Sequence, residues 1–233
     1  MLKVTKAAGV VVACALATLC STAPVAAQTA CRSFLFDDGT LQGFTLELTQ
    51  GPDLLWHTTD TCRAELAGHS APFSLYYGQD ASCNYNNTVR NGANAISPPI
   101  DVSTLHDPIE FSFNYLLFVE SSVSFDTVFV DFTTDGGGTW TPIVVKADLT
   151  NDNQWHFHFL DLSSQLVGSS TVQFRFRFDS VDNLVNSSTG WHVDDIQLCG
   201  TQVVEEIPTL NGVGVSILAA GLALLGLIFL KRR

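Results

Sequence analysis

Residues 171–178 read TVQFRFRF, a strict alternation of apolar and polar side chains. A period of two sends alternate side chains to opposite faces of a β-strand, so Val172 and the three phenylalanines are predicted to face a core. Arg175 and Arg177 then lie on the outer face. The same alternation recurs at 109–117 and at 127–132. Each of these strands therefore presents one face to a core and the other to water.

Turn residues separate these strands. The segment DGGGT at 135–139 predicts a hairpin, and the segments 97–99 and 151–153 predict loops. No convincing helical period occurs before Val213. The chain holds sixteen Phe and four Trp, which suits a core filled by aromatic rings. The sequence thus predicts an all-β domain, a sandwich of two antiparallel sheets packed face to face.

The N-terminal end has a different composition. Two lysines precede an apolar run from Ala7 to about Leu19, and small residues follow as far as Ala27. This is the layout of a secretory signal peptide over 1–27, which signal peptidase would remove. The alternative is a retained membrane anchor, which needs a longer apolar run of about 20 residues.

The C-terminal end also has a membrane-related pattern. Residues 213–230 are largely apolar, and Lys231, Arg232 and Arg233 follow them. The run is long enough to cross a bilayer as a helix, and the basic end would stay in the cytoplasm. The body of the chain is therefore predicted to lie outside. An ordinary membrane anchor is the simplest interpretation of this pattern.

The region between the two ends is strongly acidic. It carries six Lys and Arg against 23 Asp and Glu, a net charge near −17. Nucleic acids and anionic membrane surfaces need basic patches, so neither is a predicted partner. The region is long enough for one domain with a core, predicted over 28–200, followed by a short linker at 201–206.

Four cysteines remain once the signal peptide is removed, an even number in an oxidising compartment, so two disulfides are predicted. Three pairings are possible. We favour Cys31–Cys199, because first and last strands of a sandwich often lie side by side, and Cys62–Cys83 then follows. The alternative is free or metal-bound thiols, but no CxxC spacing is present.

Four motifs occur in an order that resembles a known group. They are FDDG at 36–39, SPPID at 97–101, TDGGGTW at 134–140 and GWHVDDI at 190–196. From Cys31 to Gly200 the chain resembles the MAM-like jelly-roll domains of bacterial secreted proteins, including those appended to immune-inhibitor-A-type metallopeptidases. The resemblance implies a jelly-roll sandwich. The second early cysteine that such domains usually carry has no counterpart here.

Four carboxylates lie at the two ends of this domain: Asp37, Asp38, Asp194 and Asp195. The predicted Cys31–Cys199 bond would bring the two pairs together, and clustered carboxylates repel unless a cation joins them. The resemblance implies a structural Ca²⁺ near such positions, so these four residues are the predicted ligands. The alternative is that they serve turns, because Asp37-Asp38-Gly39 is a good turn by itself.

The tail resembles the IPTL-CTERM sorting signal of Gram-negative bacteria, a relative of the PEP-CTERM signal that exosortases process. Ile207, Pro208, Thr209, Leu210 and Gly214 match the motif, and the usual Ser-Glu-Trp is Asn-Gly-Val here. The resemblance implies that an exosortase-type enzyme removes the helix, with the helix anchoring the protein in the inner membrane only before processing.

Aromatic residues supply the candidate ligand contacts. Trp56, Tyr76, Tyr77 and Tyr85 lie in or near the loop-rich region 59–94, where exposed rings would stack on sugars or anchor protein partners. The alternative is a packed cluster beneath the loops. In the strand 155–159, the two histidines at 156 and 158 share one face, predicted to meet solvent, and the three aromatic rings share the other, predicted to be core.

No catalytic motif is present: the chain lacks HExxH and GxSxG, and no cysteine stands in a recognised pattern with a histidine. Glu110, Glu120, Asp126 and Asp131 are interpreted as solvent-face residues. We therefore expect an exported, non-catalytic protein of the cell envelope, outer surface or extracellular space that acts by adhesion or ligand binding, with polysaccharide or surface proteins as partners. The alternatives are a carbohydrate-binding module and a secreted hydrolase with an unrecognised carboxylate pair.

Overall fold

The computed structural model describes residues 26–204, together with Ala220, Leu222, Leu230 and Lys231. Residues Ala27–Val203 form one compact unit. Nearly all of the predicted signal peptide lies outside the described residues, as do the sorting motif and most of the predicted membrane helix. Among the described residues, no helix is long and apolar enough to span a membrane.

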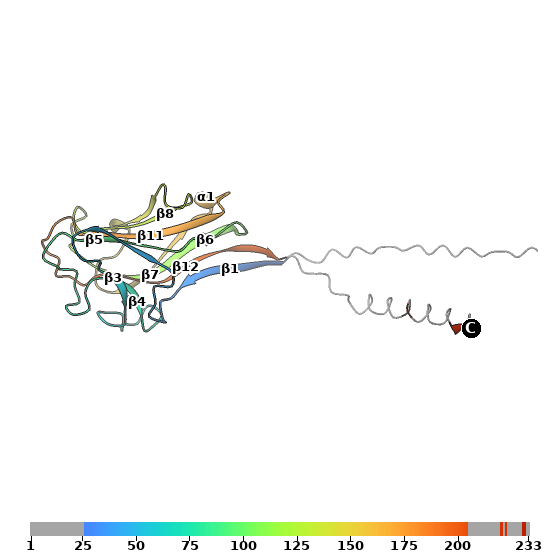
Figure 1. Ribbon diagram of the computed structural model, residues 1–233, viewed down its shortest axis with the longest axis horizontal. Coiled ribbons are helices and arrows are strands. Elements are labelled where there is room, and N and C mark those ends of the chain that lie inside the picture. Colours follow the sequence, from blue (N-terminus) through green and yellow to red (C-terminus); the bar gives the residue numbers. More distant parts are fainter. Residues whose placement is uncertain (1–25, 205–219, 221, 223–229, 232–233) are drawn as a thin grey trace, which may run out of the picture. The chain divides into compact units, whose positions relative to one another are not determined.

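Two sheets face each other across the core (Figure 1). The first, sheet A, has the order β10 (Trp155–Asp161), β7 (His106–Phe118), β12 (Gly190–Val204), β4 (Ser74–Tyr77) and β3 (Trp56–Thr59), with β1 (Ala26–Phe34) also paired to β12. The second, sheet B, has the order β2 (Thr45–Gln50), β5 (Gly92–Ile96), β11 (Thr171–Asp179), β8 (Thr127–Thr133) and β9 (Thr141–Val145), with β6 (Ile100–Asp101) also paired to β11.

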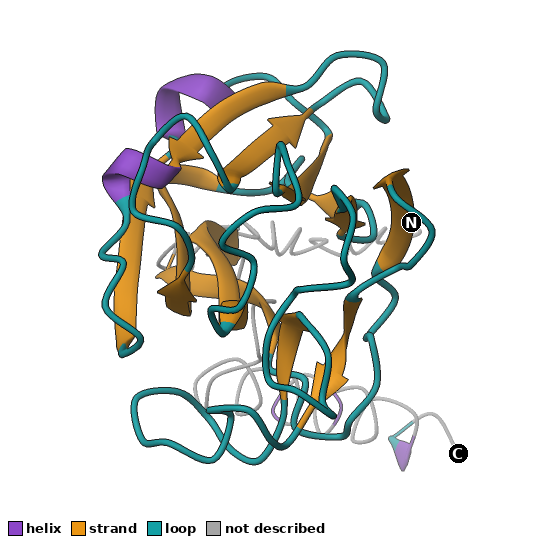
Figure 2. Ribbon diagram, turned by 90° about the vertical axis from the view of Figure 1, so that its left-hand side faces the viewer, coloured by secondary structure: helices purple, strands orange, loops and turns teal. Residues whose placement is uncertain are grey.

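Neighbouring strands within each of these two orders run antiparallel, which confirms the predicted all-β, two-sheet architecture. Helical structure in the described sandwich is limited to the 3₁₀ turn Lys146–Asp148 and the single α-helical turn α1, Ser163–Leu166. Figure 2 views the sandwich from one end, where loops cross between the strands.

Strand β11 confirms the alternation predicted for residues 171–178. Val172 and the three phenylalanines are buried, while Arg175 and Arg177 lie on the outer face. Phe174 stacks on Phe111 of β7 at 4.0 Å between ring centroids, and Phe176 meets Phe113 edge-on at 5.6 Å. These rings come from different sheets, so the phenylalanines of β11 join the two layers of the core.

The predicted hairpin is confirmed between β8 and β9. Gly136 and Gly137 have φ of +73° and +96°, values that side-chain-bearing residues rarely adopt. Asp135 closes the turn, because its Oδ1 accepts hydrogen bonds from Thr133 Oγ1 at 2.6 Å and from the backbone N–H of Thr139 at 2.9 Å. The turn chemistry therefore holds β8 and β9 together locally.

The prediction for β10 was wrong in phase. His158 pairs with Phe113 and Leu160 with Phe111, so these side chains face the core. Phe157 and Phe159 face outward and are 65% and 48% exposed. Both phases of this strand carry rings or apolar groups, and its register against β7 decides between them. The inward phase includes Leu160 and continues to the buried Leu162 just after the strand.

Both predicted disulfides are present, Cys31–Cys199 and Cys62–Cys83. The first links β1 to β12, strands that pair within sheet A. The second closes a loop-rich segment across the outer face of that sheet. Such bonds persist in oxidising compartments, which supports an extracellular or surface location for the domain.

Candidate functional site

The outer face of sheet A carries a row of side chains that crosses five strands. His57, Tyr76, His192, Leu116 and Trp155 are successive Cα partners on β3, β4, β12, β7 and β10. Ring contacts join most of the row. Tyr76 stacks on His192 with centroids 4.0 Å apart, and Trp155 lies 5.9 Å from His192.

Residues 60–73, which we call the covering loop, lie over this row. Trp155 Nε1 donates to the carbonyl of Arg63 at 3.1 Å, and the indole stacks on His69 at 3.9 Å. Gly68 has φ of +125°, and a Cβ added there would stand 2.6 Å from Trp155 Cβ. Only glycine therefore allows the loop to approach Trp155 this closely.

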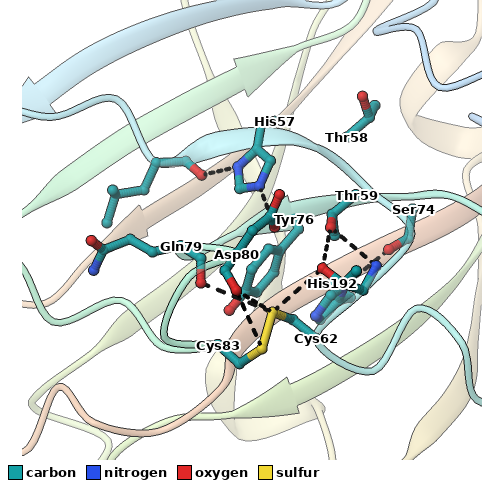
Figure 3. Close-up of polar contacts among 12 residues, drawn as sticks. His57, Thr58, Thr59, Cys62, Ser74, Tyr76, Gln79, Asp80, Cys83 and His192 are labelled. Carbon is teal, nitrogen blue, oxygen red and sulfur yellow. Dashed lines mark hydrogen bonds and ion pairs between the residues drawn. A yellow bond between two sulfur atoms is a disulfide. The ribbon is translucent and has the colours of Figure 1, made fainter.

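The disulfide Cys62–Cys83 holds the covering loop over a polar cluster (Figure 3). His192 is fully buried, and burial lowers its pKa to about 3. Its Nδ1 lies 2.9 Å from Ser74 Oγ. At the margin of the cluster, His57 Nε2 lies 2.9 Å from Asp80 Oδ1. A neutral, enclosed imidazole such as His192 packs and orients its neighbours and is closed to an external ligand.

A β-bulge brings two consecutive aspartates to the same face. Between Asp194 and Gln197 the register of β12 against β7 gains one residue, and Asp195 has φ of +49°. Regular alternation would send the two carboxylates to opposite faces. Instead, Asp195 Oδ2 accepts hydrogen bonds from Asn114 Nδ2 at 2.6 Å and from the backbone N–H of Ser70 at 2.9 Å.

Asp37 and Asp194 join this group through Ser70, whose hydroxyl lies 3.1 Å from Asp37 Oδ1 and 3.4 Å from Asp194 Oδ2. His69 Nε2 lies 2.7 Å from the carbonyl of Ala64 and donates to it, so Nδ1 shares a proton with Asp194 Oδ2 at 2.6 Å. Burial raises the pKa of Asp194 to about 7, and Asp195 adds to this effect.

Three of the four aspartates predicted as calcium ligands are thus brought together. Asp38 is not among them: its carboxylate turns to the backbone N–H and hydroxyl of Thr40 at 2.9 and 2.8 Å, which is the turn role considered for it. Asp194 Oδ1 is buried and has no hydrogen-bond partner among the described residues. Within that same part of the chain, no group of three or more His, Cys, Asp and Glu side chains is arranged to hold a metal ion.

The four aromatic residues predicted to contact ligand are buried instead: Trp56, Tyr76, Tyr77 and Tyr85 are each at most 1% exposed. Trp56 Nε1 donates to the carbonyl of Ala93 at 3.1 Å, and Tyr77 stacks on Phe178 at 4.2 Å. The polar end of each of the four has a hydrogen-bond partner within the domain. These four residues therefore form packed contacts beneath the surface, which was the alternative considered for them. None of the four rings is exposed to a ligand.

Two of the carboxylates interpreted as solvent-facing are also buried. Asp126 is 0% exposed and accepts hydrogen bonds from the Tyr85 hydroxyl and from the backbone N–H of Glu120. Asp131 is 1% exposed and binds Arg175 and Arg177. Internal partners occupy both carboxylates, so their roles are structural. The prediction failed because alternation does not show what covers an outward side chain.

The open part of sheet A begins where the covering loop ends. It contains Phe157 and Phe159 of β10, Glu110 and Ser112 of β7, and Gln197 of β12, which we call the aromatic platform. Ser112 pairs with both Phe159 and Gln197, so the rings and the polar groups lie side by side on one face. The three polar residues are half-buried, and their side chains have no hydrogen-bond partner in the described part of the chain.

No protein-family model matches this chain, and no curated protein sequence matches it. Several solved structures resemble its two-sheet sandwich. A carbohydrate-binding module of the β-sandwich superfamily has a TM-score of 0.43 and 16% identity, covering 71% of this chain and 60% of that one. An adhesin domain of Lys-gingipain from Porphyromonas gingivalis has a TM-score of 0.45 and 15% identity, covering 72% and 97%. The xylan-binding domain from Paenibacillus barcinonensis has a TM-score of 0.36 and 15% identity, covering 76% and 95%.

Proposed function

We propose that this protein is an exported, non-catalytic binding module that holds a neutral saccharide on the aromatic platform. The observation that carries the proposal is the outward position of Phe157 and Phe159 on β10. Burying such a ring contributes roughly 1.5–3 kcal/mol, so two exposed rings on one strand are unusual in a fold with a well-filled core. Exposed apolar groups rimmed by polar residues mark binding surfaces.

The chemistry of the platform favours a saccharide. Phenylalanine rings stack on the apolar faces of sugar rings, while Ser112, Gln197 and Glu110 offer hydrogen-bond partners to hydroxyls. Glu110 and the neighbouring Asp161 make this face acidic, which disfavours a polyanionic ligand here. Solved structures that the chain resembles include modules described as binding carbohydrates, and the proposal assigns the same class of role to this chain.

Alanine substitution tests the platform. The variant Phe157→Ala/Phe159→Ala should fold normally, because exposed positions usually alter stability by less than about 0.5 kcal/mol. On a neutral-glycan array it should bind at least tenfold more weakly than the wild type, a loss of about 1.4 kcal/mol.

The matched control is Val167→Ala, which removes an exposed apolar side chain, 73% exposed, outside the platform. It should bind as the wild type does. Equal binding by the double variant, or binding of no neutral glycan by the wild type, would overturn the proposal.

Calcium support remains part of the proposal. Asp37, Asp194 and Asp195 meet at Ser70, and the buried Asp194 Oδ1 lacks a partner among the described residues. Carboxylate oxygens are the ligands that Ca²⁺ prefers. A bound cation there would offset the repulsion among the carboxylates and fasten the covering loop to β12.

Chelation tests this part. Adding EGTA should lower the melting temperature, added Ca²⁺ should restore it, and Asp195→Asn should abolish the response. An unchanged melting temperature in EGTA would show that the hydrogen bonds from Ser70 and Asn114 hold the cluster without metal.

The two ends of the chain have proposed roles in export. The two disulfides of the domain suit an exported protein, as do the signal-peptide pattern of 1–27 and the MAM-like motifs. We propose that the IPTL-type tail, 207–233, is a temporary membrane handle that an exosortase-type enzyme removes. The mature domain would then reside on the outer surface or in the surrounding matrix.

A further inference from the structure

The outer face of sheet B carries two arginines that share one carboxylate. Asp131 Oδ2 accepts hydrogen bonds from Arg175 Nε and Nη2 at 2.9 and 2.8 Å, and from Arg177 Nε at 3.1 Å. Register explains the arrangement, because Asp131 on β8 lies directly opposite Arg175 and Arg177 is two residues further along β11. Two guanidinium charges therefore meet one buried carboxylate, which leaves one positive charge in excess.

Aromatic rings fix the planes of both guanidinium groups. The Arg175 guanidinium carbon lies 4.4 Å above the Trp140 ring, and that of Arg177 lies 4.0 Å above Phe129. Asp131 holds each group by its Nε edge, so Nη1 is left free. Neither Nη1 has a hydrogen-bond partner in the described part of the chain, and neither is enclosed. Fixed guanidinium groups with free N–H donors are suited to a planar carboxylate.

Two other basic groups of the sandwich, Arg90 and Lys146, have their partners within it. Arg90 is matched by Asp179 at 2.6 Å, and Lys146 Nζ is buried against backbone carbonyls. On the same face, the Glu47 carboxylate is bonded to Asn94 of β5, and Asp131 is the carboxylate bonded to Arg175 and Arg177. The positive spot therefore persists in a strongly acidic domain.

We propose that this guanidinium pair, Arg175 and Arg177, binds the carboxylate of an acidic sugar residue within an otherwise neutral saccharide. One excess positive charge matches one carboxylate. A polyacidic peptide would meet repulsion from this protein, because residues 28–206 carry a net charge near −17. The site lies on the opposite sheet from the aromatic platform, so it stands independently of the function proposed for that face.

The test uses the purified secreted protein and a disaccharide that contains glucuronic acid. Its methyl ester keeps the shape and removes the charge. In a calorimetric titration the acid should bind at least tenfold more tightly than the ester, and NMR should show shifts of the Nε–H signals of Arg175 and Arg177. Arg175→Lys and Arg177→Lys keep the positive charge but remove the planar guanidinium that can donate two hydrogen bonds to one carboxylate. Each variant should weaken binding at least tenfold.

Arg90→Lys is the matched control and should bind as the wild type does. If a lysine variant fails to fold, Trp140→Ala removes the support of Arg175 and should also weaken binding. Equal affinity for acid and ester would overturn the proposal, as would unchanged binding by the lysine variants. Preference for a sulfated disaccharide or a polyglutamate peptide would replace the acidic sugar with another ligand.

Discussion

Tyr85 and Asp126 show how a single residue acquires a role that alternation does not reveal. Tyr85 lies in a loop-rich segment with several polar neighbours, yet its ring is fully buried and meets Phe178 edge-on at 5.1 Å. Its hydroxyl donates to Asp126, and burial is the main cause of the raised pKa of that carboxyl group. The tyrosine therefore fills the core and also satisfies a buried acid.

Replacing Tyr85 by Phe should destabilise the fold by about 1–3 kcal/mol, because the buried carboxyl group loses a donor while the ring is retained. Chemical denaturation measures the change. Tyr115→Phe is a suitable control, since the Tyr115 hydroxyl accepts from the backbone N–H of Thr150 at 2.9 Å, a contact without charge. Its cost should be about 0.5–1.5 kcal/mol. A smaller loss for Tyr85→Phe than for Tyr115→Phe would contradict the assignment.

At the scale of elements, the β8–β9 hairpin depends on local sequence. Hydrogen bonds from Thr133 and Thr139 lower the pKa of Asp135 to about 2. A carboxyl group whose folded pKa is depressed stabilises the fold above its unfolded pKa, and that contribution is lost as pH falls through the folded pKa. The hairpin should therefore weaken as the pH drops from about 4 to about 2.

Asp135→Asn tests this dependence. The difference in unfolding free energy between wild type and variant should be largest above about pH 4 and should shrink as the pH falls through about 2, where Asp135 takes up its proton. A denaturation series across this range measures it. A difference that stays constant with pH would show that the carboxylate charge is not what the turn uses.

Strand β10 represents the opposite case. Its sequence has apolar side chains in both phases, so its own pattern does not show which side faces the core. Pairing with β7 decides this, because it places Leu160 beside Phe111 and His158 beside Phe113. Burial lowers the pKa of His158, consistent with a packed imidazole. The error in the predicted phase is the reason why the sequence alone missed the aromatic platform. One sequence signal could have revealed the platform. Leu160 and Leu162 continue the phase of His158, which indicates that this phase, and not that of Phe157, faces the core.

At the scale of the whole molecule, the proposed export route makes a prediction about mass. Processing at the tail should leave a mature chain that starts near Gln28 and lacks residues 213–233. Intact mass spectrometry of the protein isolated from its native host would read both ends and any attached group. A control with a truncated gene that stops before Ile207 should yield a chain lacking any group added during processing. Recovery of the 213–233 segment on the mature protein would identify the tail as a permanent anchor.

Long-range contacts decide what the proposed sites contain. The covering loop reaches β12 through His69 and Ser70, contacts between residues about 125 positions apart in sequence. The bulge at Asp195 turns two consecutive carboxylates to one face, where the pattern DD by itself indicates opposite faces. Trp56 is buried by the core between the sheets, and Tyr76 is buried beneath the covering loop. The sequence around these residues is compatible with either exposure or burial.

The sequence by itself determined the fold class, the phase of β11 and the β8–β9 hairpin, because these depend on local periodicity and turn chemistry. It favoured one of three cysteine pairings, from the expected proximity of the chain ends, and the structure established that pairing. Only the tertiary structure decided the phase of β10, the convergence of Asp37 with Asp194 and Asp195, and the neighbours of Arg175 and Arg177. Those features depend on register between strands and on a loop that crosses a face. A one-residue change in register reverses which side chains meet water, and a strand such as β10, which has apolar groups in both phases, does not specify its own register.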